Sequence, residues 1–201
     1  MTNGFIFEIF DFLVRKVLVR LNLVELFKFV AVKTFLHKGD SQIYAVANIA
    51  IDVYQIFKWL VLISLWVIGT GDSYSLYIIC YLLAFNSFTY FYYEVWGGVH
   101  SRQKSQNSSN RRFLNTMLSI FYCFFCYAYL YQIHFYSEIV WPDGIVDFFN
   151  AIYLSITTGL TLTYSGFNPV TQFMRLVFLS ELLNIFLFIT IILSNSIPNK
   201  R

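Results

Sequence analysis

Apolar side chains dominate four long segments of this chain, and short polar stretches separate them. These segments are Ile43–Gly69, Tyr74 to about Trp96, Phe113 to about Tyr136, and Gln172 to about Ser194. About 20 apolar residues are enough for a helix to cross a bilayer. The pattern therefore predicts four transmembrane helices.

A charged and periodic segment precedes the first of these spans. Over residues 5–36, charged or polar side chains recur every three or four positions with apolar side chains between them. This period is typical of an amphipathic helix, and the charges are too many for a span. Six Lys or Arg residues and four acids fall within residues 1–40. We expect this helix to lie on the anionic, cytoplasmic membrane surface, with packing on a neighbouring subunit as the alternative.

The region between the third and fourth spans has a different pattern. The turn sequence Trp141-Pro142-Asp143-Gly144 comes first, and an apolar helix predicted over residues 145–158 follows it. A Thr-rich turn then leads to Pro169 and the last span. Irregular backbone at membrane depth is tolerated only where protein buries it or where it lines a water-filled path. We therefore predict a re-entrant hairpin over residues 145–171, which enters and leaves the membrane at one face.

Composition supports a membrane protein and sets its orientation. The chain is 58% hydrophobic and 12% charged, about half the charge of a typical soluble domain. Twelve of the fourteen basic residues fall in residues 1–40, the 97–112 loop and the C-terminal tail. Excess Lys and Arg mark cytoplasmic loops. We expect a multi-pass protein of the cell membrane with both termini cytoplasmic and the hairpin entering from outside.

Four regions follow from these patterns. They are an interfacial helix (1–40), a two-helix transmembrane hairpin (41–96), a basic cytoplasmic loop that we expect to be flexible (97–112), and a C-terminal module (113–201).

No residues of the chain form a recognisable catalytic or metal-binding motif. Cys80, Cys123 and Cys126 all lie in apolar runs, and the Cys123-x-x-Cys126 pair has no second pair or nearby His to complete a metal site. The motifs of intramembrane hydrolases and zinc proteases are missing. We expect no enzyme activity, no catalytic residue, no cofactor, no resident metal and no nucleic-acid partner.

Residues 113–201 carry a set of matches to one known pattern. Ser155 and Thr158 fall on its pore-helix positions, Thr161, Tyr164, Pro169 and Thr171 on its filter and the filter's exit, and Arg175-Leu176 on the start of its inner helix. The segment thus resembles the two-helix pore module of the potassium channel family. The resemblance implies an all-α membrane fold with a pore helix and filter loop, four identical subunits around one axis, and potassium as the permeating ion, with sodium as a second candidate. It also implies roles in gating for Arg175 and Glu181.

The filter itself departs from the family sequence T-V-G-Y-G-D. At the corresponding six positions, this chain has Thr161, Leu162, Thr163, Tyr164, Ser165 and Gly166. Backbone carbonyls and the Thr161 hydroxyl would replace part of the hydration shell of the ion. Both filter glycines are missing, and Thr and Ser resist positive φ, so the backbone there is either strained or differently shaped.

Two alternatives follow from that departure. A filter at residues 157–161 would keep one glycine, although it displaces Pro169 and Arg175 from their matching positions. A non-conducting relative of the pore module, acting as a structural or regulatory membrane subunit, is the alternative to a channel.

Ionisable residues inside spans are costly and usually mark partners or pathways. Lys58 and Glu181 are predicted at similar depth, which favours an intramembrane pair. The alternative is that Glu181 faces a pocket behind the pore helix while Lys58 reaches the interface. Glu138, Asp143 and Asp147 would raise the local cation concentration at the outer mouth, or would simply be solvated loop residues.

Overall fold

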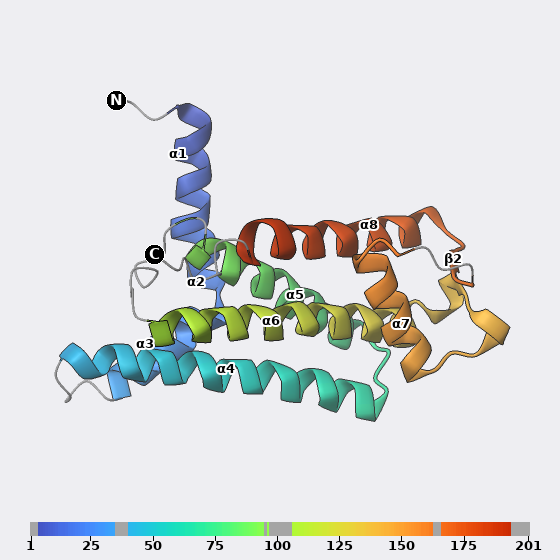
Figure 1. Cartoon of the computed structure of the whole chain (residues 1–201), viewed down its shortest axis with the longest axis horizontal. Coiled ribbons are helices and arrows are strands. Elements are labelled where there is room, and N and C mark those ends of the chain that lie inside the picture. Colours follow the sequence, from blue (N-terminus) through green and yellow to red (C-terminus); the bar gives the residue numbers. More distant parts are fainter. Residues whose placement is uncertain (1–3, 35–39, 95, 97–105, 163–165, 194–201) are drawn as a thin grey trace. The chain divides into compact units, whose positions relative to one another are not determined.

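The computed structural model describes residues 4–34, 40–94, 96, 106–162 and 166–193. These residues are mostly helical and belong to two compact units, residues 1–61 and residues 62–201 (Figure 1). Each unit is described by itself below.

The first unit begins with helices that are shorter than the sequence pattern predicts. They are α1 (Phe5–Phe12), the π-helical segment η1 (Leu13–Leu18), α2 (Val19–Leu21) and α3 (Leu23–Thr34). The predicted single helix is wrong at Asn22, where the backbone is extended (φ −81°, ψ 116°). The Asn22 side chain accepts a hydrogen bond from the Val24 N–H (3.1 Å), and Glu25 follows three residues after Asn22. This is the residue pattern of a helix N-terminus.

Helix α4 (Asp40–Ile68) follows, and the division between the two units falls within it. In the first unit, the Phe27 ring of α3 packs against Tyr54 and Phe57 of α4, with ring centroids 5.5 and 5.7 Å apart. Helix α1 has no buried residue, and large apolar side chains such as Phe5 and Ile6 are exposed. Such a surface suits the predicted location at a membrane interface.

The second unit contains the remaining elements. They are α5 (Ser73–Glu94), α6 (Gln106–Tyr129), the π-helical η2 (Leu130–His134), the 3-10 helix η3 (Tyr136–Glu138), β1 (Ile139–Val140), the 3-10 helix η4 (Pro142–Gly144), α7 (Phe148–Gly159), β2 (Asn168–Pro169), α8 (Gln172–Leu187) and the π-helical η5 (Phe188–Leu193). Residues 106–112 form the first turns of α6 and therefore are not the flexible loop that the sequence predicts. The rest of that predicted loop, residues 97–105, lies outside the described residues.

Within the part of the chain that the structure describes, four helices are long and apolar enough to cross a membrane, which agrees with the predicted number of spans. Their candidate spans are Val46–Ile68, Ser73–Tyr93, Asn110–His134 and Gln172–Thr190. The α6 span is 61% buried within the chain, whereas the α8 span is 22% buried. Helix α6 is therefore the central helix of the second unit, whereas most of the α8 surface is exposed.

A short antiparallel pairing joins the segments before and after α7. Ile139 of β1 pairs with Pro169 of β2, and Val140 pairs with Asn168. The Trp141 and Phe167 rings pack edge to face immediately inside this pairing (5.6 Å). The chain thus leaves β1, forms α7 and the loop after it, and returns to the place where it started (Figure 1).

Candidate functional site

Helix α7 begins with a side-chain cap. Asp147 accepts a hydrogen bond from the Asn150 N–H (2.7 Å), so it satisfies one of the free N–H groups of the first turn. A carboxylate is also favourable at the positive end of the helix dipole. Asp147 therefore has a structural role in starting α7, which neither sequence-based interpretation of this residue anticipated.

The far end of α7 packs between α6 and α8. A Cβ atom built on Gly159 would lie 2.7 Å from Phe124 Cε1 and 3.0 Å from Ile185 Cγ1, so any larger residue would require these side chains to move. Phe124 lies ten residues, about 15 Å, from His134 at the end of η2, and Ile185 lies about 20 Å from the start of α8. Since the hydrocarbon core is about 30 Å thick, α7 ends near half the depth of these spans.

The α7 helix closes with a tight C-terminal turn. The Leu162 N–H bonds to the Thr157 carbonyl (2.8 Å) and the Thr161 N–H to the Thr158 carbonyl (3.1 Å), which is the Schellman pattern. Thr161 occupies its left-handed position with φ 58°. Glycine is the usual residue there, and a β-branched residue costs about 1–3 kcal/mol of strain. Positive φ thus falls on the first residue of the predicted filter.

The predicted filter residues are only partly described. Thr161 and Leu162 are exposed at the tip of α7, and Gly166 is half-buried; Thr163, Tyr164 and Ser165 lie outside the described residues. The alternative filter at residues 157–161 disagrees with the structure, because Thr157, Thr158 and Gly159 belong to the helix. The assignment of residues 161–166 to a filter stays a prediction.

Ser155 of α7 and Glu181 of α8 contact each other, and both interpretations of Glu181 stay predictions. Glu181 is fully buried on α8. One carboxyl oxygen, Oε1, contacts the Ser155 Oγ of α7, and the other, Oε2, accepts from the Tyr131 hydroxyl of η2. Ser155 Oγ also lies 2.9 Å from the Phe124 carbonyl of α6. The carboxyl group therefore connects three neighbouring segments of the bundle.

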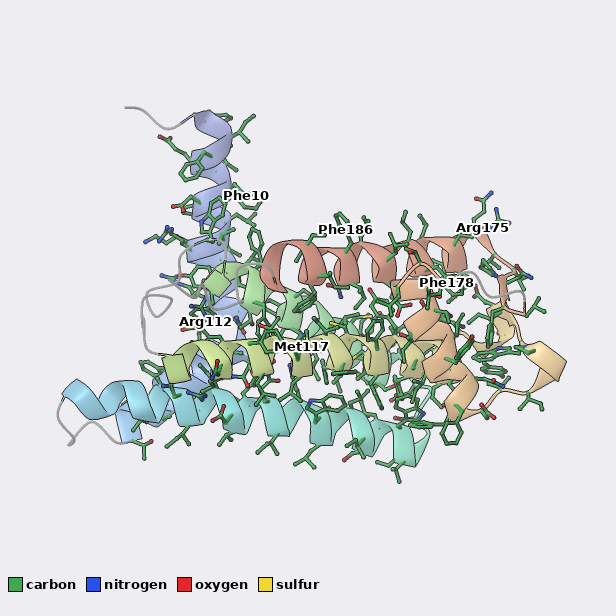
Figure 2. All side chains as sticks on the ribbon, viewed as in Figure 1. Phe10, Arg112, Met117, Arg175, Phe178 and Phe186 are labelled. Atoms are coloured by element: carbon green, nitrogen blue, oxygen red, sulfur yellow. The ribbon has the colours of Figure 1, made fainter. Side chains whose placement is uncertain are left out.

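The other predicted site residues lie apart from this cluster. Thr158 is half-buried on α7, and Arg175 is exposed near the start of α8, where its side chain points away from the bundle (Figure 2). Lys58 belongs to the first unit and Glu181 to the second. The Lys58–Glu181 pair therefore stays a prediction.

Acidic residues between the spans form hydrogen bonds at the starts of helices. Glu138 accepts a hydrogen bond from the Thr171 hydroxyl (2.5 Å), and Thr171 in turn caps α8 through the Met174 N–H (3.2 Å). Asp72 accepts from the Ser75 N–H at the start of α5 (3.1 Å). Hydrogen bonds from Ser75 lower the pKa of Asp72 below its ordinary value of 3.8. These carboxylates are thus used in local structure, whether or not they also attract cations.

His134, the last residue of the α6 span, packs against the start of α5. Its Nε2 lies 3.1 Å from the Ser75 Oγ, and its ring contacts that of Tyr129 (5.5 Å). The Ser75 hydroxyl also lies within hydrogen-bonding distance of the Thr70 and Asp72 carbonyls. His134 is therefore a packed histidine that joins the start of α5 to the end of η2.

A polar layer inside the bundle has no counterpart in the sequence-based predictions. The Asn86 amide of α5 donates to the Ser119 carbonyl and to Cys123 Sγ of α6, both at 3.2 Å. Ser87 donates to Asn184 Oδ1 of α8 (2.5 Å). Asparagine in an apolar run is the signal that could have indicated this layer, because an amide inside a membrane needs hydrogen-bonding partners.

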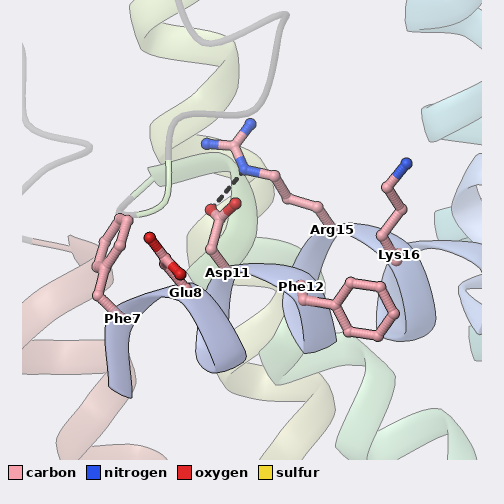
Figure 3. Close-up of a pocket in the computed structure, with 6 residues that line it drawn as sticks. All are labelled: Phe7, Glu8, Asp11, Phe12, Arg15 and Lys16. Atoms are coloured by element: carbon pink, nitrogen blue, oxygen red, sulfur yellow. Dashed lines mark hydrogen bonds and ion pairs between the residues drawn. The ribbon is translucent and has the colours of Figure 1, made fainter. Parts of the chain in front are cut away.

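The first unit holds a shallow pocket along its N-terminal helix. It is lined by Phe7, Glu8, Asp11, Phe12, Arg15 and Lys16 (Figure 3). Its main polar contact is the ion pair between Arg15 Nε and Asp11 (2.6 Å), one helical turn apart.

A second ion pair lies on α3. Burial lowers the pKa of Lys28, while the Glu25 carboxylate at 3.1 Å acts in the opposite direction. These pairs are ordinary neighbours on a helix surface.

Neither a search for metal-binding side chains nor a comparison with known proteins adds a further candidate site. The described residues contain no group of three or more His, Cys, Asp or Glu side chains that could hold a metal ion, and the three cysteines are free thiols. Comparison with protein-family models, with curated proteins and with solved structures finds no match for this chain.

Proposed function

We propose that this chain is one subunit of a homotetrameric pore-loop cation channel. Residues 161–166 of each subunit would form one strand of the selectivity filter, and potassium or another monovalent cation would pass along the common axis. The resemblance of residues 113–201 to the pore module of potassium channels motivates this proposal. The geometry of α7 and its tip is its main structural support.

The observation that carries the proposal is the exposed tip of α7. Leu160 and Leu162 are 42% and 58% exposed, and Thr161 between them is exposed as well. This turn lies near half the depth of α6 and α8, as argued above. Lipid cannot satisfy the polar groups of an irregular backbone, so at that depth the turn must be covered by protein or lie beside water. A ring of four such tips around a water-filled axis meets both conditions.

Helix α7 would also supply electrostatic stabilisation. Its capped N-terminus follows β1 in the chain, and its last turn packs between α6 and α8 at Gly159 before the exposed tip. The negative end of the helix dipole is therefore directed toward the α7 tip. Four dipoles converging on one axis favour a cation over an anion at that place.

The surface of α8 suits assembly into a ring. Its exposed apolar side chains recur at intervals of three and four residues: Phe173, Leu176, Leu179, Leu183 and Phe186, of which Phe186 is labelled in Figure 2. Such a stripe is typical of helix–helix packing. In the proposed tetramer, α8 of one subunit would pack against α8 of the next and line the path below the filter.

Ion selectivity is expected to be weaker than in the family. Gly166 stands where the family has an Asp that braces the filter from behind, and both filter glycines are missing. A filter without that brace is less rigid, so we expect potassium and sodium both to pass, with potassium preferred. The membrane would be the cell membrane, with both termini cytoplasmic.

Flux into liposomes tests the proposal. Purified protein is reconstituted and potassium-dependent uptake is compared among the wild type, Leu162→Arg and Ile6→Arg. Leu162→Arg would place four positive charges at the α7 tips and is expected to reduce cation flux at least about tenfold by repulsion. Ile6 is 82% exposed on α1, so Ile6→Arg adds the same charge far along the chain and is expected to leave the flux unchanged.

The oligomeric state and the reversal potential complete the experiment. Tetramers that pass cations, with reversal potentials between the sodium and potassium equilibrium values, agree with the proposal. Intact tetramers without current would instead identify a non-conducting relative of the pore module. Flux that is equally reduced by both Arg variants would mean that the α7 tip is not in the ion path.

A further inference from the structure

Glu181 is the most deeply buried acidic residue among the described part of the chain, and all its polar contacts are hydroxyl groups. Its side chain is fully buried on α8. Oε1 faces the Ser155 Oγ and Oε2 faces the Tyr131 hydroxyl. Neither partner carries a positive charge. We infer that Glu181 is a neutral carboxylic acid, and that its own proton completes the hydrogen-bond chain joining α7 to α6 and α8.

Counting protons around Ser155 leads to this inference. A serine hydroxyl has one hydrogen to donate and can accept two hydrogen bonds. Ser155 Oγ lies between two oxygens that would both accept from it, the Phe124 carbonyl at 2.9 Å and Glu181 Oε1. A carbonyl can only accept. Both contacts become hydrogen bonds if Ser155 donates to Phe124 and Glu181 donates its own proton to Ser155.

The second carboxyl oxygen fits the same arrangement. In a neutral acid, Oε2 is the carbonyl oxygen and accepts from the Tyr131 hydroxyl. The chain of donors then runs from Tyr131 to Glu181, on to Ser155 and finally to Phe124, and no contact is left without a proton. An ionised Glu181 would lack one proton in this chain, so the Ser155–Phe124 contact or the Ser155–Glu181 contact would bring two acceptors together.

Among the residues that the structure describes, no cation contacts Glu181. From α6 and η2, the nearby titratable groups are Tyr127, which contacts Ser180 (3.2 Å), and Tyr131. Helix α7 contains no Asp, Glu, Lys, Arg or His, and Arg175 on α8 is exposed. A buried carboxylate without a cation is costly, whereas a hydrogen-bonded neutral acid is not. The predicted pairing with Lys58 is the competing explanation, and it requires an ionised Glu181.

The network sets the position of α7 relative to its neighbours. Ser155 lies one helical turn before Gly159, so hydrogen bonds at Ser155 fix the helix just behind its tip. Glu181 is thus a positioning residue for α7. This inference depends on the structure of the second unit and is independent of whether the chain conducts ions.

Infrared spectroscopy and thermal unfolding of the full chain in detergent test the inference. At neutral pH, the wild type is expected to show the carbonyl stretch of a protonated carboxylic acid, and Glu181→Gln is expected to lack it. In Ser155→Ala, the band is expected to remain and to shift, because the acid loses the acceptor of its proton.

Thermal unfolding provides the matched comparison. Glu181→Gln replaces the acid by an amide that can donate to Ser155 and accept from Tyr131, so its midpoint should stay within about 2 °C of the wild type. Glu181→Ala leaves both hydroxyls without this partner and should lower the midpoint by at least about 5 °C. If Glu181→Ala does not fold, the infrared comparison still decides the question.

Three results would overturn the inference. They are the absence of an acid band that Glu181→Gln removes, a Glu181→Gln protein that fails to fold or is as unstable as Glu181→Ala, and recovery of a Glu181→Lys variant by Lys58→Glu. The last result would instead establish the intramembrane ion pair.

Discussion

At the scale of single residues, Thr161 combines a strained backbone with an exposed position at the tip of α7. It is the non-glycine residue with positive φ among those described. The sequence predicts strain in this loop because both family glycines are missing. It does not predict that the strain falls on Thr161, because the closing turn of α7 sets that conformation.

Replacing Thr161 by glycine should therefore stabilise the protein. Thr161→Gly removes the steric cost of φ 58° and is expected to raise the free energy of unfolding by about 1 kcal/mol after the added entropy of the unfolded chain is subtracted. Thr158→Gly is the matched control, since the same change three residues earlier falls inside α7 and should destabilise by about 0.5 kcal/mol. Thermal unfolding in detergent measures both. Equal destabilisation by the two variants would contradict strain at Thr161.

Asp72 gives a prediction for the pH dependence of stability. Because its pKa is lowered in the folded chain, the ionised form stabilises the start of α5, and this contribution is present above the ordinary value of 3.8 and lost as the pH falls below it. Asp72→Asn keeps a capping side chain but does not titrate. We expect its unfolding midpoint to fall less than that of the wild type between pH 5 and about pH 3. If the unfolding midpoints of the two proteins fall equally as the pH is lowered, Asp72 does not have this role.

Several local roles could have been predicted from short sequence patterns. Asn22 followed by Glu25, and Asp147 before an apolar helix, are typical helix starts. The hydroxyl partners of Glu181 could not be predicted, since Tyr131 and Ser155 lie 50 and 26 residues away in the chain. Their meeting depends on how α6, α7 and α8 pack.

At the scale of elements, the contact at Gly159 determines how deeply α7 enters the bundle. The sequence predicts the length of α7 to within a few residues, because the apolar run and the Thr-rich turn are local signals. It treats Gly159 as part of a turn, whereas the structure places this glycine in the last turn of the helix against Phe124 and Ile185. Close helix packing is a tertiary property that one sequence does not reveal.

A methyl group at Gly159 should separate α7 from its neighbours. Gly159→Ala places a Cβ 2.7 Å from Phe124 and 3.0 Å from Ile185, and overpacking of this kind is expected to cost about 1–3 kcal/mol of stability. The control is Gly71→Ala, where the nearest atoms would be at an ordinary 3.6 Å and little change is expected. Combining Gly159→Ala with Phe124→Leu should recover part of the loss. No recovery in the double variant, measured by thermal unfolding, would argue against this contact.

At the scale of the whole molecule, two features matter most among the described residues. Four helices are long enough to span a membrane, and the chain around α7 leaves and returns at the β1–β2 pairing, which makes a closed excursion. Hydropathy predicts the four spans well because membrane crossing depends on local composition. The β1–β2 pairing that closes the excursion could not be predicted, because each strand has two residues and no pattern of its own. It is nevertheless the feature that brings the start of α8 back to the end of α6.

Chemical labelling of single cysteines tests that closed excursion most directly. Cys80, Cys123 and Cys126 are first replaced, and one cysteine is then introduced at Arg111, Asp143 or Arg201. A membrane-impermeant maleimide is added to intact cells. The account predicts labelling at position 143, and protection at positions 111 and 201 until the membrane is permeabilised. Labelling of 201 and protection of 111 in the same intact cells would mean that residues 141–167 cross the membrane completely, and would contradict the account.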